Sequence, residues 1–164
     1  CAASGLDTRL LSPRLAYGEG LGYAFAQFVR NEPFTIDTFI ADVRSIDAEL
    51  MTIGGVEIAE FSGTTTGTLS GNLREEIVNG ILWDAFDEAS ADEPFDRVAL
   101  GVDGMMTLLV DHFGGPLPPN QGAAGLDLAD LLYALVCFSG VPAEDAQALA
   151  DDRAFPWIAP TVCD

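Results

Sequence analysis

The chain has 164 residues, of which 49% are hydrophobic, and this length and composition suit one domain with a substantial core. Twenty-six acidic residues against seven Arg give a net charge of −19, which argues against nucleic-acid binding and against docking on an anionic membrane. The apolar runs are too short for a transmembrane helix.

The first predicted element is an amphipathic helix over residues 15–30. Residues 1–12 have no periodicity and read as a lead-in loop, after which Ser12 and Pro13 suit the start of a helix. Pro33 ends the pattern. The predicted core-facing stripe is Tyr17, Leu21, Ala24, Phe25 and Phe28. The opposite face carries Glu19, Gly22, Tyr23 and Ala26.

The middle of the chain has mixed signals. Residues 34–43 fit either a short helix or an extended segment, and residues 54–61 alternate as a short strand would. Residues 62–71 are rich in Thr, Gly and Ser and read as a loop that could border a cleft.

The second half is predicted to be helical. Asn72, with Glu75 three residues later, resembles a capping box for a helix that runs to about Glu88. Further helices are expected over residues 96–113, over residues 127–138 and from Pro142, before an extended tail over residues 154–164. Predicted inward-facing residues are Leu73, Ile77, Ile81, Leu82, Val98, Val102, Met105, Met106, Leu109, Val110, Leu128, Leu131, Leu132, Leu135, Ala146 and Leu149. The pattern predicts a mainly α fold over residues 1–164: a single domain of about five helices with a short β-hairpin.

Three cysteines are too few for a disulfide scaffold. Cys137 lies in an apolar helical run and is predicted to be a buried thiol. A disulfide between Cys1 and Cys163 stays open, and so does a lipid on Cys1 of a bacterial lipoprotein. Because the sequence starts at Cys1 without a signal sequence, we expect a processed or excised piece from an extracytoplasmic protein.

Glu19 lies among three glycines, Gly18, Gly20 and Gly22, at the start of the first helix. Each glycine inside a helix costs about 1 kcal/mol relative to alanine, so three at alternate positions need a reason. One reading is that another backbone packs closely here and Glu19 joins a zinc site. The other is a helix-start acid that meets the helix dipole, with glycines filling small packing gaps.

The segment over residues 14–26, RLAYGEGLGYAFA, resembles the Gly-Glu-Gly helix of bacterial glutamate zincins, which are similar to fungalysin and more distantly to thermolysin. Residues 81–87, ILWDAFD, resemble a later helix of that family. The resemblance implies a helical C-terminal domain of a peptide-hydrolysing zinc enzyme. It implies that Glu19 is the third zinc ligand, that Tyr23 lies near the metal, and that Trp83 and Asp84 wall the substrate cleft.

The sequence also departs from that family. It holds one histidine, His112, so the His-Glu-x-x-His motif with both zinc imidazoles and the general base is absent. Tyr23 stands where fungalysin has an Asp, and residues 64–72 lack the histidine that stabilises the oxyanion. We expect the C-terminal half of a secreted zinc metallopeptidase, inactive without its N-terminal catalytic half and a peptide substrate. The alternative is a catalytically inert, acidic binding or structural module of a secreted protein or surface lipoprotein.

Two further metal hypotheses concern polar side chains. His112 ends a predicted helix, where a cation suits the helix dipole; zinc ligation or general-acid chemistry is the alternative. An acidic stretch is predicted to be a solvated face, with calcium binding as its alternative. Its members are Asp84, Asp87, Glu88, Asp92 and Glu93.

Overall fold

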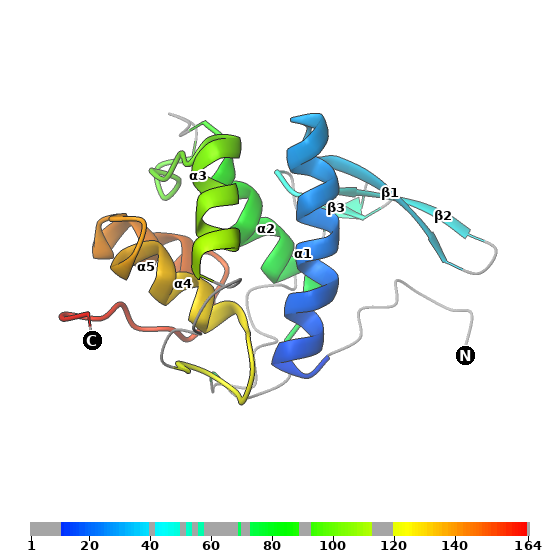
Figure 1. Cartoon of the computed structure of the whole chain (residues 1–164). Helices are drawn as coiled ribbons and strands as arrows, with labels where there is room; N and C mark the ends of the chain where they lie inside the picture. Colours follow the sequence, from blue (N-terminus) through cyan, green and yellow to red (C-terminus); the bar gives the residue numbers. More distant parts are fainter. Residues whose placement is uncertain are drawn as a thin grey trace.

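The computed structural model describes residues 11–39, 42–49, 52–53, 56–57, 69, 73–88, 93–112 and 120–163. Within them the fold is mainly helical with a small antiparallel sheet, as the sequence predicts (Figure 1). The elements in chain order are α1 (Pro13–Arg30), β1 (Phe34–Phe39), β2 (Asp42–Asp47), β3 (Thr52–Ile53), β4 (Val56–Glu57), α2 (Glu75–Phe86), α3 (Gly101–Thr107), the π-helical turn η1 (Leu108–His112), α4 (Leu128–Cys137) and α5 (Ala143–Asp152).

Helix α2 is the centre of the core. Every residue from Glu76 to Phe86 is buried, and α2 contacts α1, α3 and α5. The predicted inward residues Ile77, Ile81 and Leu82 are fully buried. The predicted start is wrong: α2 begins at Glu75 with Arg74 as its N-cap, and Asn72 lies outside the described residues. The helix ends at Phe86, close to the predicted end.

Helices α1 and α2 approach each other closely at Gly20. A Cβ at this position would stand 2.5 Å from the Glu75 carbonyl oxygen and 2.7 Å from the Val78 Cβ, well inside van der Waals contact. Gly18 and Gly22 have nothing within 4 Å of the same position. Close packing therefore explains one of the three glycines and leaves the other two facing open space.

Helix α1 begins and ends where the sequence predicts. Ser12 is its extended N-cap, Pro13 occupies the first turn, and Asn31 ends it in the left-handed conformation with φ of 52°. Tyr17, Ala24 and Phe28 face the core, and Leu21 packs against it. Phe25 is 47% exposed, so its assignment to the core was wrong.

The middle segment is extended. Strands β1 and β2 pair antiparallel, with Phe34 opposite Asp47 and Phe39 opposite Asp42, and the two-residue strands β3 and β4 continue the meander. For residues 34–39 and 42–43 the extended alternative is therefore the one observed. Of the strand predicted over residues 54–61 the structure describes β4, and of the loop over 62–71 it describes Leu69.

The third helix is shorter than predicted and changes its winding. Residues 96–100 are not helical; α3 begins at Gly101 and passes into the π turn at Leu108. Leu108 is fully buried, whereas Val102, Met106 and Val110, predicted to face the core, are 52%, 37% and 57% exposed. The buried and half-buried residues here, Gly101, Gly104, Met105, Leu108 and Leu109, keep regular helical spacing, so the core-facing side lies one position away from the predicted stripe.

Helices α4 and α5 match their predictions. Asp127 accepts hydrogen bonds from the Ala129 and Asp130 amides, and Asp130 accepts one from the Asp127 amide, which completes a capping box. The predicted core residues of both helices are fully buried: Leu128, Leu131, Leu132, Leu135, Ala146 and Leu149.

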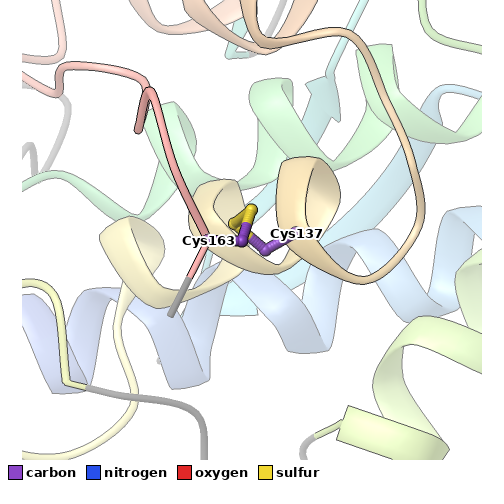
Figure 2. Close-up of a disulfide and its surroundings, with 2 residues drawn as sticks. All are labelled: Cys137 and Cys163. Atoms are coloured by element: carbon purple, nitrogen blue, oxygen red, sulfur yellow. A yellow bond between two sulfur atoms is a disulfide. The ribbon is translucent and has the colours of Figure 1, made fainter.

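A disulfide joins Cys137, at the end of α4, to Cys163 in the C-terminal tail (Figure 2). The prediction of a buried Cys137 thiol is therefore wrong, and Cys163 is not available to Cys1, which lies outside the described residues. The tail is also held by Gln147 of α5, which donates to the Trp157 carbonyl and accepts from the Ala159 amide. In the part of the chain that the structure describes, no helix is long and apolar enough to cross a membrane.

Candidate functional site

Glu19 lies on the exposed side of α1, away from α2, and Tyr23 one turn later is half-buried and packs against the core. The exposed residues around Glu19 are mostly apolar or small. Together they form what we call the open face of α1: Leu15, Gly18, Gly22, Phe25, Ala26 and Val29. The structure thus places the predicted zinc ligand at the surface, beside an apolar stripe.

The spacing within the open face is that of a helix-pairing seam. Leu15, Gly18, Gly22, Phe25 and Val29 follow one another at alternating intervals of three and four residues. Leu15, Phe25 and Val29 are 50%, 47% and 72% exposed. The glycines between them leave room for a second helix to come close.

Trp83 has its ring buried between α2 and its neighbours. Its indole Nε1 donates a hydrogen bond of 2.8 Å to Oε2 of Glu49, and its ring packs against Phe86, which stacks on Phe28. Trp83 and Phe86 also line a cavity of about 490 Å³ at the end of α2. That Trp83 walls a substrate cleft stays a prediction.

Asp84 does not line that cavity. It is 2% exposed, and its Oδ2 lies 2.7 Å from Nη2 of Arg153, which follows α5. The predicted solvated face is therefore wrong for Asp84, because the carboxylate is buried and paired.

Asp84 belongs to an acidic cluster, defined by Glu49, Asp84, Asp87, Glu93 and Asp96 with Arg153. Burial raises the pKa of Asp84 to about 7, although Arg153 lowers it. Burial also raises the pKa of Asp87 to about 8, of Glu93 to about 7 and of Asp96 to about 6, and neighbouring carboxylates add to each shift. Among the described residues, this cluster thus contains five carboxyl groups and one cation, Arg153.

The sequence indicated part of this cluster. Asp84, Asp87 and Glu93 fall in the acidic stretch, but Glu49 follows β2 and Asp96 precedes α3. Their convergence depends on the packing of three separate segments. The sequence contained one usable signal, which is an acid, Asp84, on the apolar face of a helix.

The raised pKa values predict that the protein is more stable in acid. The native cluster binds protons that the unfolded chain has lost above about pH 5, so stability falls as pH rises toward 8. We expect the melting temperature to be higher at pH 5.5 than at pH 8.5 in 150 mM NaCl. The gain is on the order of 1 kcal/mol, below the full conversion of the pKa shifts because several groups are partly solvated.

Asp87→Asn is the matched variant for that prediction. It removes one carboxyl that is costly to ionise, so it should raise the melting temperature at pH 8.5 and leave it almost unchanged at pH 5.5. Equal melting temperatures of the parent at both pH values would contradict the assignment.

The cavity lies between the ends of α1 and α2 and the start of α3. Its described lining residues are Asn31, Trp83, Phe86, Asp87, Glu88, Ala99, Leu100, Gly101 and Val102. The lining includes aromatic and aliphatic side chains and two acids, Asp87 and Glu88.

No group of three or more His, Cys, Asp or Glu side chains is arranged to hold a metal within the described ranges. His112 is the last residue of η1, and its side chain, like Asp92, lies outside the description. Zinc binding by Glu19 and calcium binding by the acidic stretch both stay predictions.

No protein-family model, no curated protein and no solved structure matches the chain. The resemblance to glutamate zincins therefore depends on the two sequence segments quoted above.

Proposed function

We propose that this chain is the C-terminal helical half of a secreted zinc metallopeptidase and supplies Glu19 as the third zinc ligand. The observation that carries the proposal is the position of Glu19, exposed at the edge of the open face of α1. A ligand for a metal shared with another segment must be accessible to that segment. In this position the Glu19 carboxylate is accessible.

The open face is the docking surface that the proposal requires. Its occupant is the helix of an N-terminal half that carries His-Glu-x-x-His, as the Gly-Glu-Gly resemblance implies. The three-four spacing fits packing against a helix, and Gly18 and Gly22 let its backbone come near Glu19. Trp83 and Phe86 are buried in α2, and Phe86 stacks on Phe28 of α1, which holds α1 against α2.

One carboxylate does not make a zinc site, so this half is inactive by itself. Zinc sites of this class use two imidazoles and a carboxylate, and here two imidazoles must come from the partner helix. When bound, zinc lowers the pKa of a coordinated water and makes it a nucleophile near neutral pH. On this chain, Glu19 would hold the metal and Tyr23 would lie one turn beyond it.

The disulfide supports an extracytoplasmic location. Disulfides persist in secreted and periplasmic proteins and are rare in the cytosol, where thiols are kept reduced. Cys137 and Cys163 form such a bond between α4 and the tail.

The test uses the complete reading frame in which this sequence is encoded. We expect it to encode His-Glu-x-x-His upstream, and its product to hold one zinc ion per chain by metal analysis. Glu19→Gln should lower zinc affinity at least tenfold and abolish peptide hydrolysis, whereas Glu32→Gln, an exposed acid just past α1, should change neither. A product that keeps its zinc with Glu19→Gln, or a reading frame without the motif, would rule the proposal out.

The acid-lined cavity favours a second candidate, which is a catalytically inert, acidic binding module of a secreted or surface protein. This candidate needs no second histidine, and the chain contains a single histidine, His112. It predicts a reading frame without His-Glu-x-x-His and a ligand that binds without any metal. The two candidates are therefore separated by the same expression experiment.

A further inference from the structure

We propose that the cavity at the end of α2 binds an organic cation, namely a protonated amine or guanidinium carried on an apolar group. The proposal is independent of Glu19 and of zinc. Asn31, at the cavity, is twelve residues beyond Glu19 along α1. With a rise of 1.5 Å per residue, the two sites lie roughly 18 Å apart along the helix axis.

The size and walls of the cavity suit an apolar body. Its volume is about 490 Å³, within the range of small-molecule sites. Trp83 and Phe86 provide aromatic surface, and Leu100 and Val102 provide aliphatic surface. Phe86 is held by its stacking on Phe28, so this wall exists before any ligand arrives.

The cavity also has acidic lining residues. Asp87 and Glu88 line it, and no described lining residue is basic. One Asp87 oxygen, Oδ1, is buried and has no hydrogen-bond partner among the described residues. An ammonium or guanidinium group supplies both the missing donor and a positive charge.

The carboxyl groups around Asp87 also favour the binding of a cation. Glu49 faces Asp87 from the end of β2, Asp84 from the same helix and Asp96 from the segment before α3, and each raises the pKa of Asp87. Arg153 is the one cation of the cluster, and it is already paired with Asp84 at 2.7 Å and with Asp152 at 3.2 Å. A positive ligand would relieve repulsion that the chain leaves unbalanced.

An organic cation explains this site better than a divalent metal ion does. Calcium takes six to eight oxygen ligands, whereas Asp87 and Glu88 are the only carboxylates among the described lining residues. Aromatic faces, in contrast, contribute to the binding of organic cations.

Binding is predicted to release a proton. Because burial raises the pKa of Asp87 to about 8, its carboxyl is mostly protonated at pH 7 in the free protein. A cation beside it favours the ionised form, so affinity should increase between pH 6 and pH 9, as long as the ligand itself stays charged. Hydrophobic binding alone would show no such dependence.

The experiment uses phenethylamine as the probe and 2-phenylethanol as its uncharged counterpart. Titration calorimetry in two buffers of different ionisation enthalpy measures both affinity and proton release. We expect saturable binding of the amine, at least tenfold weaker binding of the alcohol, and a shift of the Trp83 indole N–H resonance that Trp157 does not share. Equal affinities for amine and alcohol, or no binding of the amine, would overturn the proposal.

Three variants locate the site. Asp87→Asn should weaken amine binding at least tenfold and remove its pH dependence, and Val102→Trp, at a half-exposed lining position, should block the cavity. Asp103→Asn, which makes the same charge change on exposed α3 outside the lining, should leave binding unchanged. Unaltered amine binding by Asp87→Asn would contradict the site. So would a protein that binds calcium and does not bind the amine.

Discussion

Replacing Arg153 with Met is expected to lower the free energy of unfolding by about 1–1.5 kcal/mol more at pH 8 than at pH 5. The substitution leaves Asp84, which is 2% exposed, without its cation partner 2.7 Å away. A buried carboxylate without a partner is costly, whereas its protonated form is tolerated. Since the pKa of Asp84 is about 7 even with Arg153 present, Asp84 is neutral at pH 5 in both proteins. Urea denaturation at the two pH values measures the difference.

Two controls separate the charge effect from lost packing. Arg97→Met removes an exposed arginine that stands 3.7 Å from Asp145, and it should cost less than about 1 kcal/mol at either pH. Adding Asp84→Asn to Arg153→Met removes the buried charge and should recover most of the loss at pH 8. A pH-independent loss would mean that Arg153 acts mainly through its packing over Phe95, where it lies 5.5 Å from the ring centre.

Replacing Gly20 with Ala is the second large expected effect, a loss of about 2–3 kcal/mol in the free energy of unfolding. The added methyl group would meet the Glu75 carbonyl oxygen at 2.5 Å and Val78 at 2.7 Å, and the backbone oxygen cannot rotate away. Helices α1 and α2 would have to move apart. Thermal and urea denaturation measure the loss.

The neighbouring glycines supply the control. Gly18→Ala and Gly22→Ala meet nothing within 4 Å, so each should stabilise the isolated chain by about 0.5–1 kcal/mol through helix propensity. In the proposed complex with a partner helix, the same two substitutions should weaken assembly. Three similar effects from the three glycines would contradict the packing shown here.

Local chemistry made most helices predictable. Pro13 and Ser12 mark the start of α1, Asp127 with Asp130 caps α4, and the leucines of α4 repeat at helical spacing. These signals depend on residues within one or two turns of each other. The sequence pattern of β1 fits both a helix and an extended chain. Its partner strand, not its own pattern, decides the conformation.

What the sequence could not predict depends on distant segments. Phe25 looks like a core residue, yet α2 covers only the side of α1 that holds Gly20, so the Phe25 ring stays exposed. The core-facing side of α3 lies one position away from the predicted stripe, because tertiary packing and not the local pattern decides which side is covered. The acidic cluster required Glu49 and Asp96 to reach α2 from two other segments.

The same limit applies to the candidate sites. The position of Glu19 on α1 followed from the helix pattern, but the seam of exposed residues beside it became visible only when α2 proved to cover the opposite side. Residues 99–102 line part of the cavity near Trp83, whereas the sequence pattern predicts a regular helix over them.

The bond between Cys137 and Cys163 makes the last part of the chain a covalent ring, with the two half-cystines 26 positions apart in sequence. Helix α5 and Arg153 both lie inside this ring. A single peptide-bond cut within it, for example by a protease outside the cell, would therefore release no fragment. Both ends of the cut would stay attached through sulfur, and Arg153 would remain tethered close to Asp84. An exposed tail is thereby protected against loss after one cleavage.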